Sequence, residues 1–377
     1  MSVTNVESLQ YGVATASLGF SSKFTLEDKF AAIQKAGFKF VELGFSGYVE
    51  WVRQKLPNLP ASTAPEEYAE GGEPDPSDQE LWQALYSKTD DVKALAASFD
   101  LTILVLQPLN QFEAWSPGSE RQQWCRRKAE KWLPLCSKLG VKQLQVGSND
   151  KPEAPATFEE IGRDLNWLAE LGAKQNPPVK IAYESWCFGE RLASWEDTWK
   201  LVQLGDHPNL GLCLDTAHWP LSPIYGYDPT TGEGFTDQQF KEMLGRLSEI
   251  PGEKIFYVEL SDVLKPVVPL GKGSPFDEWR VKANSPRGDR FVWAVCGRPV
   301  PFVGRDAGRQ VKTQDDMGGA RVLECFKTIL ASGFNGPVMW ECFEALTMEK
   351  DDEDIPALYA NAMWESRTKL IEGIKSG

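Results

Sequence analysis

The chain has 377 residues, of which 42% are hydrophobic and 11% aromatic, and its formal net charge is −14 at pH 7. So much large apolar material excludes disorder of the whole chain. The excess of acidic residues, with no run of lysine or arginine, argues against a protein that binds nucleic acid or an anionic membrane through their phosphate groups.

Membrane insertion and export are not expected either. No apolar run approaches the ~20 residues that a membrane span needs, and Met1 is followed by a polar stretch instead of a leader peptide. The seven cysteines are scattered without a Cys-x-x-Cys pair, which favours a reducing compartment over a disulfide framework. We therefore predict a cytoplasmic protein. Only two histidines are present, which argues against histidine-rich zinc sites.

Short apolar runs alternate with amphipathic stretches along the chain, a pattern typical of buried parallel strands joined by helices. The predicted strands cover 10–16, 38–43, 101–106, 142–146, 179–183, 210–214, 254–260 and 337–340. The predicted helices cover 25–35, 78–99, 119–139, 157–174, 194–204, 236–248, 313–331 and 355–374. Long loops on the active face are predicted at about 45–77, 216–235 and 261–312.

Eight strands and eight helices in alternation predict a closed (β/α)8 TIM barrel that forms one domain over residues 1–377. The alternative is an open, doubly wound sheet. No Gly-x-Gly-x-x-Gly motif follows the first strand, which weakens a dinucleotide-binding interpretation of that alternative.

Acidic residues end each of the last four predicted strands: Glu184, Asp215, Glu259 and Glu341. In a barrel these strand ends converge on one mouth. One such acid would mean little, but like charges ~4 Å apart repel by about 4 kcal/mol at an effective dielectric constant of 20. A divalent cation would offset this repulsion, and oxygen ligands favour Mg²⁺ or Mn²⁺, with Co²⁺ as a further candidate. The sequence therefore predicts one shared metal site.

His218 lies three residues after Asp215, at the start of a long loop on the same face. Imidazole exchanges protons near neutral pH, so His218 is a candidate acid or base, or a hydrogen-bond donor beside the metal. The alternative is a histidine that only contributes to packing.

Several segments around these acids resemble the xylose-isomerase-like barrel superfamily of sugar phosphate isomerases and epimerases. Within it, the chain is most similar to the fungal 3-dehydroshikimate dehydratase group. The similar segments are Leu106-Gln107-Pro108, Asn176-Pro177-Pro178, Tyr183-Glu184, Arg191 with Trp195-Glu196, 211–216 and 256–258.

The resemblance implies metal ligands at Glu184, Asp215, Glu259 and Glu341. One departure is Glu259, which stands where the family usually has histidine or glutamine. A site with Glu259 is more anionic than those of its relatives, so either the metal differs or Glu259 also accepts a proton.

A metal that binds a keto substrate lowers the energy of the enolate formed by removal of a neighbouring proton. Loss of a β-hydroxyl then gives dehydration of a polyhydroxylated keto substrate, which the resemblance favours. The alternative outcome is isomerisation or epimerisation of a sugar-like substrate at the same site. The candidate bases are His218, Glu184 and Glu259, with His218 as the first choice.

A substrate carboxylate would need a cation in this negative mouth. The candidates on active-face loops are Arg191, Lys265, Arg298 and Arg305, of which Arg191 and Lys265 lie nearest in sequence to proposed ligands. Gln107 and Trp186 are further candidates for substrate binding.

Two rival functions are a repair nuclease of the related endonuclease barrels, which would need many histidines, and a barrel that binds without catalysis. The sequence leaves the oligomeric state open, and a homo-oligomer is compatible with it.

Overall fold

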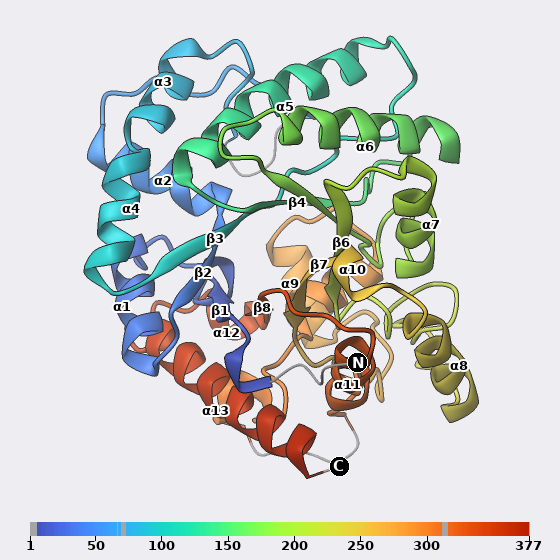
Figure 1. The fold of residues 1–377 in the computed structure, drawn as a ribbon. Coiled ribbons are helices and arrows are strands. Elements are labelled where there is room, and N and C mark those ends of the chain that lie inside the picture. Colours follow the sequence, from blue (N-terminus) through green and yellow to red (C-terminus); the bar gives the residue numbers. More distant parts are fainter. Residues whose placement is uncertain (1–5, 66, 69–72, 311–315, 377) are drawn as a thin grey trace.

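Eight strands form a closed, all-parallel barrel in the computed structural model, which describes residues 6–65, 67–68, 73–310 and 316–376 (Figure 1). Each strand pairs with the next along the chain, and β1 pairs with β8 to close the ring. The predicted TIM barrel is thereby confirmed. The strands are β1 (Tyr11–Ala14), β2 (Phe40–Gly44), β3 (Thr102–Gln107), β4 (Gln143–Gly147), β5 (Lys180–Glu184), β6 (Leu210–Asp215), β7 (Ile255–Leu260) and β8 (Val338–Trp340).

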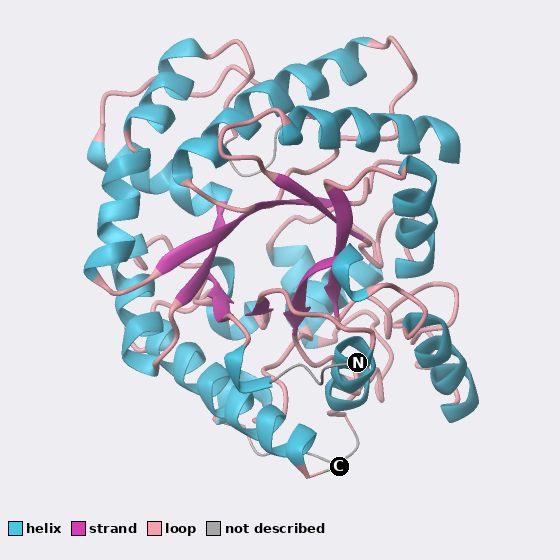
Figure 2. Cartoon of the chain, in the orientation of Figure 1, coloured by secondary structure: helices cyan, strands magenta, loops and turns pink. Residues whose placement is uncertain are grey.

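Helices surround the ring of strands (Figure 2). They are α1 (Leu26–Ala36), α2 (Phe45–Lys55), α3 (Gln79–Ser87), α4 (Thr89–Ser98), α5 (Glu120–Leu139), α6 (Phe158–Ala173), α7 (Trp195–Gly205), α8 (Asp237–Leu247), α9 (Pro275–Lys282), α10 (Asp289–Cys296), α11 (Val322–Ala331), α12 (Ala345–Met348) and α13 (Ile355–Lys375). In the described part of the chain, none is both long and apolar enough to cross a membrane.

Side-chain caps fix where several helices begin. Thr25, Thr157 and Thr236 each accept a hydrogen bond from the backbone three residues later, and the side chain at that position bonds back to complete a capping box. These caps lie where the sequence predicted helix starts, directly after the loops that leave the barrel mouth or the turns between elements. Local sequence therefore determines much of the alternation.

Two apolar layers hold the barrel together. The large cluster fills the space between strands and helices, and a small separate cluster is made of strand residues. The small cluster occupies the interior of the barrel, as in other TIM barrels. Its members are Leu104, Val105, Ala182, Cys213, Phe256, Tyr257 and Met339.

Four predictions of local structure were wrong, of which three concern the first hundred residues and the helix after residue 313. The segment 45–77, predicted as a loop, begins with helix α2, because Tyr48, Trp51 and Val52 form an apolar stripe that packs against the barrel. The predicted helix 78–99 is two helices that meet at Lys88. The helix predicted from residue 313 begins at Val322, and residues 313–315 lie outside the described residues.

The long segment after β7 is also more ordered than a loop, since it contains α9 and α10. In the view of Figure 1, α9 appears within the ring of strands and α10 appears next to β6 and β7. Residues of α10 line a cavity together with Glu184 and Glu341, which follow from β5 and β8. The segment therefore covers the end of the barrel at which the strands finish.

Candidate active site

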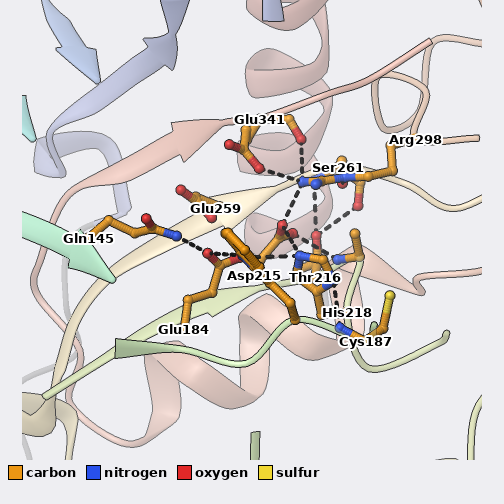
Figure 3. A network of polar contacts seen from close by, with 12 residues as sticks. Gln145, Glu184, Cys187, Asp215, Thr216, His218, Glu259, Ser261, Arg298 and Glu341 are labelled. Carbon is orange, nitrogen blue, oxygen red and sulfur yellow. Dashed lines mark hydrogen bonds and ion pairs between the residues drawn. The ribbon is translucent and has the colours of Figure 1, made fainter. Parts of the chain in front are cut away.

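Four carboxyl groups meet at the carboxyl ends of the last four strands (Figure 3). Glu184 and Asp215 end β5 and β6, Glu259 is the penultimate residue of β7, and Glu341 directly follows β8. The register places Asp215 beside Glu259 across neighbouring strands. All four side chains are buried. The barrel closure thus brings together acids that are up to 157 residues apart, from 184 to 341.

The donor set fits a divalent cation. Oxygens of Asp215, Glu259 and Glu341 lie within 4.8 Å of one another, and so do ligand atoms of Glu184, Asp215 and His218. Ligands on opposite sides of a Mg²⁺-sized ion are about 4.2 Å apart, so a small adjustment would let one ion contact them. Glu184 Oε1 and Glu259 Oε2 are buried without a hydrogen-bond partner. Unpartnered buried carboxylate oxygens are costly, and a cation would satisfy them.

Arg298 supplies a positive charge inside this cluster. Its Nη2 donates to Asp215 Oδ2 at 2.5 Å, to Glu341 Oε2 at 2.9 Å and to the Glu341 carbonyl at 2.7 Å. Its Nε donates to Ser261 Oγ at 3.0 Å. Burial opposes the charge of the guanidinium, but Asp215 and Glu341 raise its pKa above the ordinary value. The buried arginine therefore stays charged and holds two of the four acids in place.

Arg191 and Lys265, the two cations that the sequence favoured for substrate binding, do not line the cavity beside these acids. Arg191 donates from Nε to the Ala154 carbonyl at 2.9 Å, and the backbone amide of Lys265 donates to the Asp316 carbonyl at 2.7 Å. Among the described residues, the cations that line the chamber are Arg287 and Arg298. Arg298 lies 39 residues after Glu259, so sequence proximity to a ligand could not single it out.

Amide and indole side chains also donate hydrogen bonds to Glu341 and Glu184. Gln107 Nε2 donates to Glu341 Oε1 at 2.9 Å, and Trp186 Nε1 donates to Glu184 Oε2 at 2.8 Å. Gln145 Nε2 also donates to Glu184 Oε2. Gly147 makes room for the indole, because a Cβ there would lie 2.1 Å from Trp186 Cζ2. The sequence had singled out Gln107 and Trp186, and both line the chamber.

His218 is held as a neutral hydrogen-bond donor. Its Nδ1 accepts from the Cys187 amide at 3.1 Å, so the ring proton lies on Nε2. That nitrogen is 3.3 Å from Glu184 Oε1 and 3.4 Å from Asp215 Oδ2. Burial lowers the pKa of His218 to about 4, although Asp215 raises it. The only ring lone pair of the neutral histidine is thus already engaged by the backbone.

A fifth buried acid, Glu42 of β2, was missed by the sequence analysis. The Tyr257 hydroxyl lies 2.8 Å from Glu42 Oε1 and 3.0 Å from Glu259 Oε1. A hydroxyl has a single proton, so two full hydrogen bonds at this position require one of the two carboxyl groups to be protonated and to donate to Tyr257. The raised pKa values of Glu42 and Glu259 agree with a protonated carboxyl group here. The available signal was a lone glutamate near the end of an otherwise apolar strand.

The mouth favours protonated carboxyl groups until a cation binds. Burial raises the pKa of Glu184 well above its ordinary value, and the charges of Asp215 and Glu341 raise it further. Burial also raises the pKa of Glu259 and of Glu42, with added repulsion from neighbouring acids. A bound divalent cation would reverse this effect, because it favours the charged form of each ligand.

Two of the four acids, Glu184 and Glu341, line a chamber of about 330 Å³. Its walls include Glu184, His218, Glu341, Arg298 and the aromatic ring of Phe188. A concave pocket of this size, with a few convergent polar groups and acids of raised pKa, has the properties of an enzyme active site. Fold and site together define a (β/α)8 barrel with its chemistry at the carboxyl ends of β5 to β8.

The family model described as xylose isomerase-like TIM barrel matches residues 30–292. The chain belongs to this family. A curated relative from Neurospora crassa, named 3-dehydroshikimate dehydratase, is 28% identical over 67% of this chain and 67% of its own length. A relative of the same name from Pseudomonas aeruginosa is 33% identical over 67% of this chain. The match spans only 31% of that longer protein.

Solved structures agree on the fold. The IOLI protein, whose crystal structure contains a zinc atom, has a TM-score of 0.57 and 16% identity, covering 98% of this chain and 99% of its own. The comparisons thus place the chain among enzymes of the xylose isomerase-like barrels.

Proposed function

We propose that the protein is a divalent-metal-dependent lyase that removes water from a polyhydroxylated keto substrate of the 3-dehydroshikimate type. The observation that carries the proposal is the convergence of Glu184, Asp215, Glu259 and Glu341, with two buried oxygens that have no partner. The names of the curated relatives support the same reaction class.

Glu184, Asp215, Glu259 and Glu341 are the residues that would hold the cation. Their oxygen donors suit Mn²⁺ or Mg²⁺, with Co²⁺ as a further candidate. When bound, the cation would polarise the substrate carbonyl and stabilise negative charge on its oxygen. All seven cysteines are buried and free of disulfides, which supports our placement of the protein in the reducing cytosol.

The proton next to the carbonyl passes to a carboxylate in our proposal. We assign the acceptor role to Glu259, because its Oε2 is buried without a hydrogen-bond partner and its Oε1 contacts Tyr257, whereas the lone pair of His218 is occupied. Tyr257 contacts Glu259 and offers the proton a path toward Glu42. The Nε2–H of His218 remains as a donor toward the reacting oxygens, in keeping with the second role that its sequence position suggested.

Dehydration then requires the carbon–oxygen bond of a β-hydroxyl to break. The electron pair of the enolate forms the new double bond, and the departing hydroxyl takes a proton and leaves as water. Arg298 and Arg287 are the cations that line the chamber and could hold an anionic group of the substrate. Arg287 is paired with Asp150, and Arg298 is paired with Asp215 and Glu341, so either contact would require an existing ion pair to be shared with the substrate.

Epimerisation is the second candidate. It is favoured by one observation: both Glu184 and Glu259 present an unpartnered oxygen, and they come from different strands. Two carboxyl groups on different sides of a carbon could remove a proton from one face and return it to the other.

The deciding experiment follows ultraviolet absorbance while the purified protein and Mn²⁺ are incubated with 3-dehydroshikimate and, separately, with ketohexoses. A conjugated, absorbing product means elimination. Conversion of a ketohexose without absorbance means epimerisation, and the absence of any conversion contradicts both candidates. Glu341→Gln is the matched control, because it keeps the shape of a proposed ligand and removes its charge.

The acceptor is tested by solvent hydrogen exchange at the acidic carbon of the substrate. We expect Glu259→Gln to lose exchange by about 10²-fold or more, as general-base removal commonly does. His218→Ala should retain measurable exchange. Loss of exchange in His218→Ala, with exchange preserved in Glu259→Gln, would return the role of base to His218.

A further inference from the structure

A second cavity adjoins the chamber of the carboxyl groups. It has a volume of about 650 Å³, against about 330 Å³ for the chamber itself. The two share four lining residues, Gln107, Pro108, Val295 and Phe343. Gln107 also donates to Glu341. A single side chain, Gln107, therefore lies between this cavity and the proposed metal ligand Glu341. We call the cavity the distal compartment.

Aromatic rings form much of the distal compartment. Phe20, Phe24 and Phe343 line it, and the rings of Phe20 and Phe343 are 5.9 Å apart. The guanidinium carbon of Arg298 lies 4.8 Å from the Phe343 ring centroid. Phe343 therefore lies at the boundary between the chamber and the distal compartment, whose walls also include Lys29, Glu50 and Arg53. Phe20 is 39% exposed, so an apolar ligand group could cover a ring that water now contacts.

A third cavity beside the chamber has walls of a different character. This cavity of about 730 Å³ shares Phe188, Arg287 and Phe291 with the chamber. Its arginines are engaged within the protein: Arg287 pairs with Asp150, and Arg290 Nη1 donates to the Leu221 and Tyr227 carbonyls at 2.6 and 2.8 Å. Eight charged residues line this cavity, against three in the distal compartment, so the distal compartment suits an apolar group better.

We propose that the substrate has two parts: a polyhydroxylated keto ring that reacts in the chamber, and an aromatic substituent on that ring that binds in the distal compartment between Phe20, Phe24 and Phe343. This inference rests on the proposed function, since it places the reacting ring at the carboxyl cluster. A chamber of about 330 Å³ is large enough for a single ring, while the distal compartment would otherwise stay unused by so small a substrate. Aromatic rings bind one another through buried area and offset or edge contacts.

Ser46 offers a way to fill the distal compartment without touching the chamber. It lies on α2, is exposed, and lines only the distal compartment. Ser46→Trp should occupy the space of the aromatic substituent. Ser98→Trp is the matched control, because Ser98 is equally exposed and lies at the end of α4, before β3 and away from the mouth.

The test uses two ligands that differ only in the substituent, the phenyl and methyl 3-keto-β-glucosides, and measures their dissociation constants by calorimetry with Mn²⁺ present. We expect the phenyl compound to bind the wild type and Ser98→Trp at least about tenfold more tightly than the methyl compound, because it buries an apolar ring. In Ser46→Trp that preference should fall below about twofold, while the methyl compound binds as before.

Equal binding of the two compounds to the wild type, or a preference that persists in Ser46→Trp, would overturn the inference. If neither compound binds but 3-dehydroshikimate is dehydrated, the inference that the distal compartment binds an aromatic substituent is refuted, and the proposed function stands. If the preference appears and Ser46→Trp removes it, yet no substrate is converted with Mn²⁺, the compartment stands and the proposed function fails.

Discussion

Two buried charge clusters in this protein differ in their balance of acids and cations. In the first, beside α5, Lys128 Nζ contacts Glu73 Oε2 at 2.9 Å and the Asn110 carbonyl at 3.0 Å, while Trp132 Nε1 donates to Glu73 Oε1 at 2.7 Å. One acid faces one base, and both oxygens of the acid have partners. This cluster attaches the segment before α3 to α5.

The second cluster, at the mouth of the barrel, contains more acids than cations. Five buried carboxyl groups gather there with Arg298 as their only buried arginine partner among the described residues, and Glu184 and Glu259 each leave an oxygen without a hydrogen bond. A satisfied buried pair stabilises a local fold, whereas an unsatisfied excess of one charge indicates a site made for a ligand. The difference separates structural from functional acids better than burial does.

The largest expected effect comes from removing one charge at the mouth. Asp215→Asn should lower kcat/KM by about 10³-fold or more, because a metal ligand supports several kcal/mol of charge stabilisation in the transition state. The temperature of thermal unfolding should be nearly unchanged or slightly raised, because removing one negative charge reduces the repulsion among the acids. Steady-state kinetics and calorimetry measure the two quantities, and activity near that of the wild type would contradict our assignment.

Breaking the Lys128–Glu73 pair should instead lower stability and leave the activity of the folded protein unchanged. Lys128→Met leaves Glu73 buried without its cation, which typically costs about 3–5 kcal/mol of unfolding free energy. Activity per folded molecule should persist. Denaturant unfolding with and without Mn²⁺ tests the contrast, because the ion should not preferentially rescue this variant. A loss of activity larger than the loss of folded protein would show that the two clusters are coupled.

Arg298→Met should destabilise the metal-free protein by about 1–3 kcal/mol, because it leaves hydrogen-bond acceptors buried without their partner. Mn²⁺ should restore the loss, and a ligand at 100 times its dissociation constant stabilises a folded protein by about 2.7 kcal/mol. Arg298→Lys retains the charge and should fall between the wild type and Arg298→Met. The measurement is the midpoint of unfolding as a function of Mn²⁺ concentration. Failure of Mn²⁺ to stabilise any of the three proteins would exclude a metal site.

A further expected effect is the pH dependence of stability in the metal-free protein. Burial raises the pKa of Glu184 in the folded state, so the stability it contributes is fully present below the unfolded pKa of 4.5 and is lost as pH rises through the folded value. Stability should therefore fall from acidic to neutral pH, and Glu184→Gln should flatten that fall. Calorimetry between pH 4.5 and 8 measures it, and an identical slope in both proteins would contradict the expectation.

Glu344 gives a control away from the ligands, with a predictable window. Burial raises its pKa to about 7 from 4.5, so the stability it contributes below pH 4.5 should be lost by pH 7, an effect of about 3 kcal/mol. Glu344→Gln should remove this loss in both the metal-free and the Mn²⁺-loaded protein. The Glu184 effect, in contrast, should vanish when Mn²⁺ is bound.

The sequence by itself determined the barrel and four of its mouth acids. Short apolar runs at regular intervals specify buried parallel strands, and capping residues such as Thr25 and Thr157 specify where helices begin. In a parallel barrel every strand ends at the same mouth, so the position of Glu184 or Asp215 at a strand end already fixes its place in space. These are local patterns combined with one rule of topology.

Only the tertiary structure decided which cation lies at the mouth of the barrel and which ring nitrogen of His218 points toward the acids. It also decided that Glu42 joins the cluster. Arg298 arrives from a long insertion whose path depends on packing over the barrel end, and the Cys187 amide that engages His218 comes from a different loop. Glu42 meets Glu259 across the barrel interior, beside Tyr257. Contacts between distant segments have no local signature in the chain, because their energy depends on closure of the ring that brings them together.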